Sequence, residues 1–198
     1  MKEQKTANMS KNSIKTQTEN QTRFEKPSFF ILLLCLCLLS AIHFVPHEAG
    51  VTSIGAIGIL AAAYLSVRTM PLAVMAPVIL GNILIGGYDI RAMALVLLAH
   101  LLAAFSVVPV LRRIKIGNFF IACFGSAIVF YLVSNIVPMV MGYYPNNTAG
   151  WLTCYINGLP YLWRGMLANM VFVGLVLCVI GTFKEMTDAN RFTASKRV

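Results

Sequence analysis

Met70–Lys115 reads MPLAVMAPVILGNILIGGYDIRAMALVLLAHLLAAFSVVPVLRRIK. Two mostly apolar runs, Met70–Gly86 and Ala92–Leu111, are separated by only five residues, and basic residues follow the second run. Each run is long enough to cross a hydrocarbon core of about 30 Å as an α-helix. A connection this short makes successive helices antiparallel neighbours. The stretch therefore predicts a pair of transmembrane helices.

The rest of the chain repeats this pattern. Hydrophobic residues make up 58% of the sequence and charged residues only 12%, whereas about a quarter of an ordinary soluble domain is charged. The predicted fold class is all-α: a polytopic membrane helical bundle over residues 27–183. Its six predicted transmembrane helices are Pro27–Val45, Val51–Val67, Met70–Gly86, Ala92–Leu111, Asn118–Met141 and Gly165–Phe183.

The basic residues orient this bundle. With the N-terminus inside, fourteen of the sixteen Lys and Arg residues lie in cytoplasmic stretches, and only Arg91 and Arg164 lie outside. Such an excess is typical of cytoplasmic loops. The sequence predicts a multi-pass protein of the plasma (bacterial inner) membrane with both termini in the cytoplasm. Residues 1–26, a disordered tail, and residues 184–198 are the predicted cytoplasmic tails, because neither has enough apolar surface to bury.

Several function classes are disfavoured by composition. The net charge of +9 is spread over a tail and short turns rather than an aromatic-rich patch, so we expect contact with the lipid bilayer and no nucleic acid. No paired carboxylates, phosphate loop or nucleotide fingerprint occurs, and the five cysteines lack metal-ligand spacing. We therefore expect no catalytic residues, no metal and no cofactor, and the protein is not expected to be an enzyme.

The longest connection, residues 142–164, is rich in tyrosine and tryptophan, which favour the headgroup level of a membrane. We expect an aromatic outer loop there. Thr148 can cap a short interfacial helix that continues through Ile156, and Gly158 and Pro160 would end it. Small residues such as Gly55 and Gly58 make the second segment the predicted central helix, because they let helices approach closely.

Three asparagines share one predicted depth. Given the orientation, Asn82, Asn135 and Asn169 each lie about 7–9 Å below the outer end of their helix. An unpaired amide in hydrocarbon costs several kcal/mol, so these groups must face each other, water or a ligand. One interpretation is a polar pocket open to the outer face. The alternative is that each asparagine only bonds a neighbouring helix as structural glue.

Further residues join this hypothetical pocket from nearby positions. Thr52 and Ser53 open the second helix at a similar level, and Ser134 precedes Asn135. Aromatic residues of the outer loop would form a lid over it. The predicted substrate-binding set is therefore Asn82, Asn135, Asn169, Ser134, Thr52, Ser53, Tyr144, Trp151 and Tyr155. For His100, near the middle of the fourth helix, the favoured interpretation is a neutral imidazole bonded to another helix, with a proton carrier as the alternative.

A spread-out signature carries a family resemblance. Its residues are Ser134-Asn135, Tyr144-Pro145, Thr148-Ala149-Gly150-Trp151-Leu152, Cys154-Tyr155 and Gly158-Leu159-Pro160-Tyr161, with Pro46-His47 and Thr52-Ser53-Ile54-Gly55-Ala56 earlier. This pattern resembles an uncharacterised family of bacterial six-helix membrane proteins similar to the substrate-binding S-components of energy-coupling factor (ECF) transporters. The resemblance implies a subunit that captures a small solute from outside and releases it inward with transmembrane coupling and ATPase subunits as partners.

The chain departs from that pattern at two kinds of position. Asn82 and Asn169 stand where members often carry an acidic residue, which suits either a small neutral solute or loss of the ancestral activity. The first helix lacks the small-residue face with which S-components usually dock on their partner. A non-transport membrane scaffold or assembly partner therefore stays as the alternative function, with the asparagines as glue and the aromatic loop as a docking surface.

Overall fold

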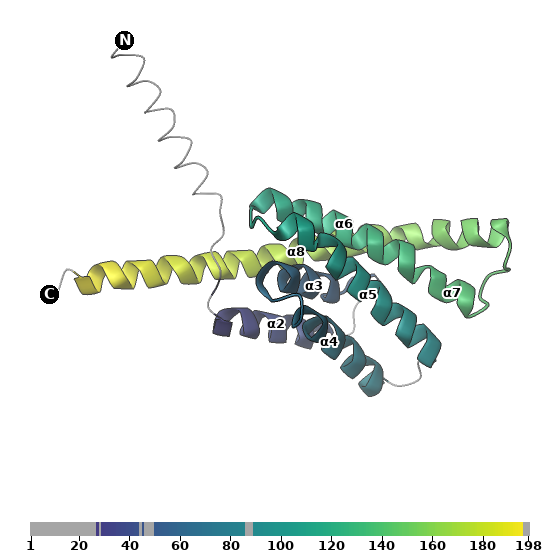
Figure 1. Cartoon of the computed structure of the whole chain (residues 1–198), viewed down its shortest axis with the longest axis horizontal. Coiled ribbons are helices and arrows are strands. Elements are labelled where there is room, and N and C mark those ends of the chain that lie inside the picture. The colour runs from purple at the N-terminus through teal and green to yellow at the C-terminus, as the bar shows by residue number, and fades with distance from the viewer. Residues whose placement is uncertain (1–26, 28, 44, 46–49, 86–88, 196–198) are drawn as a thin grey trace, which may run out of the picture.

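The computed structural model describes residues 27, 29–43, 45, 50–85 and 89–195 of the chain. Every regular element in these residues is helical, as the all-α fold class predicts. The predicted tail of residues 1–26 lies outside the described residues. The helices, shown in Figure 1, are α2 (Phe29–His43), α3 (Ile54–Tyr64), α4 (Met70–Ile85), α5 (Ile90–Leu111), α6 (Ile116–Ser134), α7 (Ile136–Val140) and α8 (Thr148–Ser195).

Three stretches of helix are long and apolar enough to cross a membrane: Ile90–Leu111, Ile116–Val140 and Thr148–Met186. The apolar helices α2, α3 and α4 are shorter, with 15, 11 and 16 residues. Large apolar side chains such as Leu98 and Leu175 are exposed on the long helices. A surface of this kind marks a membrane or a partner. The chain therefore has the character of a membrane-associated helical protein.

The central position of α3 confirms the prediction from its small residues. This helix contacts α2, α4, α5, α6 and α8, and most of its side chains are fully buried. At Gly58 a Cβ atom would lie 3.2 Å from Cβ of Ala104, so the backbones of α3 and α5 approach closely. The helix is shorter than the predicted Val51–Val67 span. It begins only after Ser53, whose hydroxyl donates to Leu39 O (2.6 Å) on α2, and it ends before the extended Leu65.

The α6–α7 junction lies inside the predicted fifth span. Pro138 has no backbone N–H, so it cannot donate to the Ser134 carbonyl four residues earlier, which is where a continuous helix would need that bond. The helix is interrupted at Asn135 and resumes as α7. Gly142 then adopts a positive φ of 76° and turns the chain toward α8.

The predicted short interfacial helix is wrong. Residues 142–147 form the connection, and α8 continues through Gly158 and Pro160 as one helix of 48 residues. Asn147, rather than Thr148, caps it, because its Oδ1 accepts from the Gly150 N–H (2.8 Å). Proline weakens a helix but need not end one where neighbouring helices support it, and here α6 packs along α8. The predicted tail is helical as well, up to Ser195.

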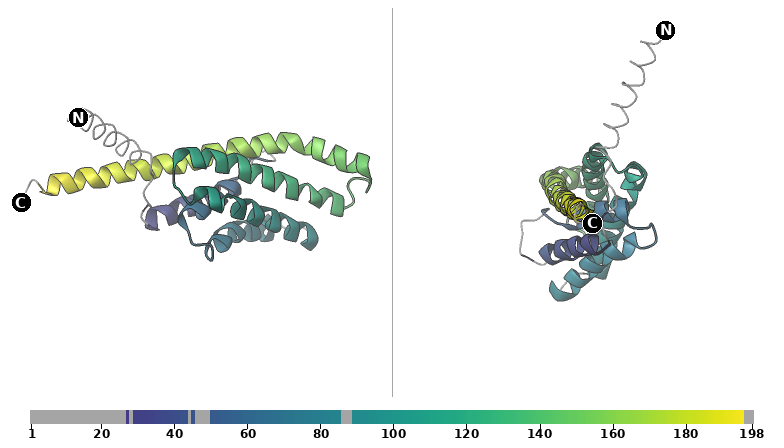
Figure 2. Two further views of the ribbon diagram at one scale, coloured as in Figure 1. Left: turned by 45° about the horizontal axis from the view of Figure 1, so that its top comes forward. Right: turned by 90° about the vertical axis from the view of Figure 1, so that its left-hand side faces the viewer.

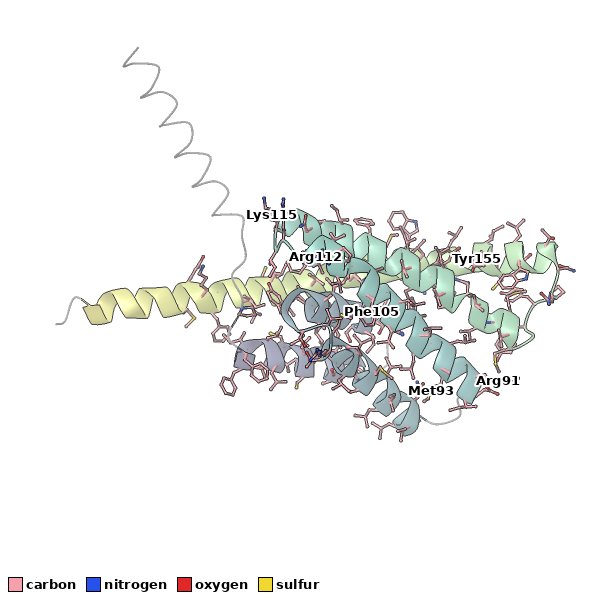
Figure 3. All side chains as sticks on the ribbon, in the orientation of Figure 1. Arg91, Met93, Phe105, Arg112, Lys115 and Tyr155 are labelled. Carbon is pink, nitrogen blue, oxygen red and sulfur yellow. The ribbon has the colours of Figure 1, made fainter. Side chains whose placement is uncertain are left out.

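Figure 2 shows α8 running the length of the bundle and projecting beyond it at the C-terminal end. The two ends of the bundle differ in their connections. Arg112 and Lys115 lie at one end, whereas Arg91 and Tyr155 lie toward the other (Figure 3). At that second end Asp89 caps α5 and pairs with Arg91 (3.2 Å), whose guanidinium holds the pKa of the Asp89 carboxyl below its ordinary value.

Two half-buried tyrosines offer a test of the packing. Among the described residues, the Tyr64 hydroxyl is buried without a hydrogen-bond partner, whereas the Tyr131 hydroxyl donates to Tyr155 O (2.6 Å). We expect Tyr64→Phe to leave the stability unchanged or to raise it, because no bond is lost. Tyr131→Phe should lower the free energy of unfolding by about 1 kcal/mol, since the Tyr155 carbonyl loses its donor. Denaturation in detergent measures both; equal losses would contradict the packing described here.

Candidate functional site

A cavity of about 570 Å³ lies between α3, α5, α6, α7 and α8. Its walls combine small residues, aromatic rings and polar side chains. The lining residues are Gly50, Thr52, Ile54, Gly55, Gly58, His100, Ala103, Ala104, Ser126, Ala127, Phe130, Tyr131, Ser134, Asn135, Pro138, Tyr144, Cys154, Asn157, Gly158, Tyr161, Leu162, Gly165 and Asn169.

Small residues leave room for this cavity, and two of them also leave room for asparagines. A Cβ atom on Gly55 of α3 would collide with Oδ1 of Asn169 on α8. In the same way, a Cβ on Gly158 of α8 would lie 2.5 Å from Oδ1 of Asn135. Each amide therefore fits against a glycine of a facing helix. The lack of a side chain at these two positions fixes where the amides lie.

The two asparagines use their amide nitrogens within the protein. Nδ2 of Asn169, which is buried, donates to Cys123 O on α6 (3.3 Å). Nδ2 of Asn135 donates to Tyr131 O one turn earlier (2.7 Å), and the Cys154 thiol lies 3.4 Å from Asn135 O. Oδ1 of Asn135 also accepts from the Cys154 thiol (3.8 Å). Because an amide oxygen has two lone pairs, both amide oxygens can still accept a hydrogen bond beside the cavity. The arrangement thus shows the structural bonds of the glue interpretation, and it also places two acceptors where a ligand could donate.

His100 of α5 forms part of the inner wall. Its Nδ1 lies 2.8 Å from Val96 O on the same helix, and its ring centroid lies 4.4 Å from that of Phe130 on α6. Because a carbonyl only accepts, Nδ1 carries the hydrogen in this bond, and Nε2 carries the lone pair when the ring is neutral. The neighbouring Ser126 on α6 is also buried. The imidazole and the hydroxyl therefore add polar groups to this part of the cavity wall.

Tyrosines of the α7–α8 connection and of α8 form one rim of the cavity. Nδ2 of Asn157 donates to the Tyr144 hydroxyl (3.2 Å), which ties the connection before α8 to that helix. Gly50, with a φ of 88°, lies against Tyr161, since a Cβ there would be 3.1 Å from Tyr161 Cα. The residues before α3 and those of α8 thus meet at the rim.

Five of the nine predicted site residues line the cavity: Asn135, Asn169, Ser134, Thr52 and Tyr144. Whether they bind a ligand stays a prediction. Among the described residues, none from α4 lines the cavity, so Asn82 lies outside it. Matching depth did not bring Asn82 together with the other two asparagines.

The other three predicted residues are engaged elsewhere. Ser53 donates to α2, as described above. The Trp151 indole donates to Asn146 Oδ1 (3.2 Å), and its ring stacks on Tyr155 with centroids 6.3 Å apart. The Tyr155 hydroxyl donates to Leu132 O (2.8 Å) on α6. These two rings fasten α8 to its neighbours instead of covering the cavity as part of a lid.

Several lining residues were missed as site candidates in the sequence analysis. His100 carried a signal, because an ionisable residue in the middle of a span is uncommon. Ser126, Tyr131 and Asn157 carried little, since hydroxyl and amide residues also serve as interhelical bonds. Asn157 was also missed because the sequence analysis expected an outer loop there. Only a continuous α8 places Asn157 on the helix face that lines the cavity.

The lining combines uncharged residue types with one histidine, His100. Among the described residues, no Asp, Glu, Lys or Arg lines the cavity. Within that same part of the chain, no group of three or more His, Cys, Asp or Glu side chains is arranged to hold a metal ion. Hydrogen-bonding groups and apolar walls together match an uncharged molecule with both polar and apolar parts.

Comparison with known proteins gives one match. Residues 24–191 match the model of a family described as "Family of unknown function (DUF6580)". No curated protein and no solved structure matches the chain. The match covers every described helix except the last few residues of α8.

The glycine–asparagine contacts predict a sharp difference between glycines. Gly55→Ala should lower the free energy of unfolding by about 1–3 kcal/mol, because the new methyl group meets the Asn169 amide. Gly125→Ala is the matched control: a Cβ there has no described atom within 4 Å, and alanine favours the helix by about 0.5–1 kcal/mol. Denaturation of both variants in detergent makes the comparison.

The double variant Gly55→Ala/Asn169→Ala tests the cause. Removing the amide should recover part of the loss from Gly55→Ala, so the two effects should not add. Additive losses would show that the cost arises elsewhere.

Proposed function

We propose a function for this chain from the chemistry of its cavity. The chain belongs to DUF6580, a family of unknown function, so the family match does not supply one. The chain is an integral membrane protein that binds a small neutral solute in the cavity between α3, α5, α6, α7 and α8. The observation that carries the proposal is the convergence of Asn135, Asn169 and His100, from three helices, on one cavity without a charged side chain among the described residues.

The proposed topology has six spans with both termini in the cytoplasm of a bacterial cell. The distribution of basic residues supports it, as do the three long apolar helices. The shorter helices α2, α3 and α4 are apolar as well. They pack against the long helices.

This topology directs the cavity toward the outer face. Tyr144 belongs to the α7–α8 connection, which lies at the end of the bundle opposite the α5–α6 turn that holds Arg112 and Lys115 (Figure 1). Gly50 and Thr52 precede α3, and Gly50 lies against Tyr161 of α8. The residues of two connections that this topology places inside, 65–69 and 112–115, do not line the cavity in the part of the chain that the structure describes. A solute from outside would therefore reach the asparagines without crossing the whole membrane.

The size and chemistry of the cavity support a small molecule. A volume of about 570 Å³ lies within the roughly 300–1,000 Å³ that is usual for ligand pockets. The Asn135 and Asn169 oxygens accept hydrogen bonds, and the rings of Phe130, Tyr131 and Tyr161 offer apolar or stacking surface. A buried charge on the solute would lack a partner in such a site, which costs much more than a neutral group.

For the solute's fate we propose capture and inward release, as in an S-component of an ECF transporter. This step rests on the residue pattern around Ser134–Tyr161 and not on a matched relative. Its partners would be a transmembrane coupling subunit and an ATPase. One observation favours the alternative, a membrane scaffold: both amide nitrogens already serve as structural donors. The solute experiment separates the two functions.

Solute binding predicts a thermal shift that depends on the lining residues. A panel of neutral vitamins, nucleosides and similar metabolites is added to the purified protein in detergent. A solute at a hundred times its Kd stabilises the native state by about 2.7 kcal/mol, so Tm rises. Asn135→Ala should lose most of that rise, whereas Asn82→Ala, outside the cavity, should keep it. No shift with any compound, or equal shifts in both variants, would favour the scaffold.

The proposed topology has its own test. Alkaline phosphatase folds to an active enzyme only outside the cytoplasm, so a fusion after Gly142 should be active and a fusion after Lys115 inactive. Green fluorescent protein fused after Val198 should fluoresce, because the C-terminus is placed inside. An active phosphatase after Lys115 would overturn this orientation.

A further inference from the structure

A second hollow lies on the inner half of the α6–α8 contact, away from the cavity. This groove has a volume of about 310 Å³, and apolar side chains and one glycine form it. We call it the α6–α8 groove; Phe119, Phe120 and Cys123 line it from α6, and Val173, Gly174 and Leu177 from α8. Along α6 it extends from Ile116 to Cys123, which is about 10 Å of helix.

The groove and the cavity are separate. They share no lining residue among those that the structure describes. The hydrogen bond from Asn169 to Cys123 O lies between them, since Asn169 lines the cavity and Cys123 the groove. A molecule in the groove would therefore meet only apolar walls and would not reach the polar groups of the cavity.

Positive charge lies beside the end of the groove that Ile116 lines. Arg112, Arg113 and Lys115 immediately precede Ile116, the first lining residue on α6, and both arginines are exposed. Figure 3 shows Arg112 and Lys115 at this end of the bundle. On α8, Lys184 and Glu185 follow the last lining residue, Cys178, and their formal charges cancel. The turn before α6 therefore keeps three basic residues beside an apolar groove.

We infer that the α6–α8 groove binds one anionic phospholipid, with an acyl chain along Phe119, Gly174 and Leu177 and the headgroup phosphate against Arg112 and Arg113. An acyl chain matches the apolar walls, and a phosphate matches the arginines, whose guanidinium groups bind phosphate oxygens well. A transmembrane helix of a partner or of a second copy would fit the walls without using the charges. The inference rests on the membrane embedding proposed above and not on the solute.

Basic residues near a membrane surface each favour an anionic lipid by about a factor of five. Removing two of these basic residues should therefore weaken the binding of an anionic lipid about thirtyfold. Filling the groove should act on the acyl chain instead. Gly174→Leu offers this change without a collision, because a Cβ at Gly174 has no described atom within 4 Å. Excluding roughly two methylene groups from the groove should weaken binding about tenfold.

The experiment uses native mass spectrometry of the purified full-length chain titrated with phosphatidylglycerol or phosphatidylcholine of the same acyl chains. We expect one tightly held phosphatidylglycerol and at least thirtyfold weaker phosphatidylcholine. The double variant Arg112→Gln/Arg113→Gln should lose about thirtyfold for phosphatidylglycerol only, and Gly174→Leu about tenfold for both lipids. Two control variants should match the wild type. Arg68→Gln removes a charge from another turn, and Gly125→Leu places a side chain in open space elsewhere on α6.

Three results would overturn the inference. The first is equal retention of the two lipids by the wild type, and the second is equal effects of Gly174→Leu and Gly125→Leu. The third is a dimer that Gly174→Leu dissociates while lipid retention stays the same, which would assign the groove to a second copy. The solute-dependent Tm shift should be unchanged in Gly174→Leu, so failure of the lipid inference and failure of the proposed solute binding are distinguishable.

Discussion

The rest of the structure depends on one constraint: polar groups among apolar helices must find partners inside the protein. Asn135 and Asn169 meet it with backbone carbonyls, and each has a glycine opposite, at Gly158 and Gly55. Without those glycines the amides could not lie where they do, and the helices would have to separate. The same small residues that let the helices approach also leave the cavity between them. Close packing and an interior void therefore have one cause in this chain.

The fold was predictable where the signal is summed over many residues. Apolar segments of sufficient length indicated helices, and the glycine and alanine residues of α3 indicated a central helix. The prediction failed where helix-ending residues lie in a helix that packs against another helix over many residues. Gly158 and Pro160 read as a helix end, yet α8 continues through both, because α6 supports this turn and Gly158 is needed for contact with Asn135. Local propensity is overridden when tertiary packing supplies more energy than the proline costs.

The sequence predicted site residues correctly only where the depth of a residue along its helix is enough to place it at the cavity. Counting residues from helix ends gives a height in the membrane, and by that measure Asn82, Asn135 and Asn169 are equivalent. It gives neither the rotation of a helix nor its neighbours, and α4 does not reach the cavity in the described part of the chain. Ser53 shows the same limit: its depth is right, but its hydroxyl faces α2. Trp151 and Tyr155 were assigned by residue type, whereas stacking and a bond to Leu132 O decide where they lie.

The α6–α8 contact shows how one pair of helices can serve two kinds of molecule. Where it borders the cavity, the contact includes amides and hydroxyls among apolar residues, and along the α6–α8 groove its residues are aliphatic and aromatic, with two cysteines and one glycine. The hydrogen bond from Asn169 to Cys123 O separates the cavity from the groove. The amide pairs with the Cys123 carbonyl, so the groove beyond it presents only apolar surface. A hydrated solute could not enter the α6–α8 groove without losing its hydrogen bonds. An acyl chain in the cavity would bury the polar groups there without partners. The change from polar to apolar residues along the α6–α8 contact thus separates the proposed solute from the proposed phospholipid without a conformational change.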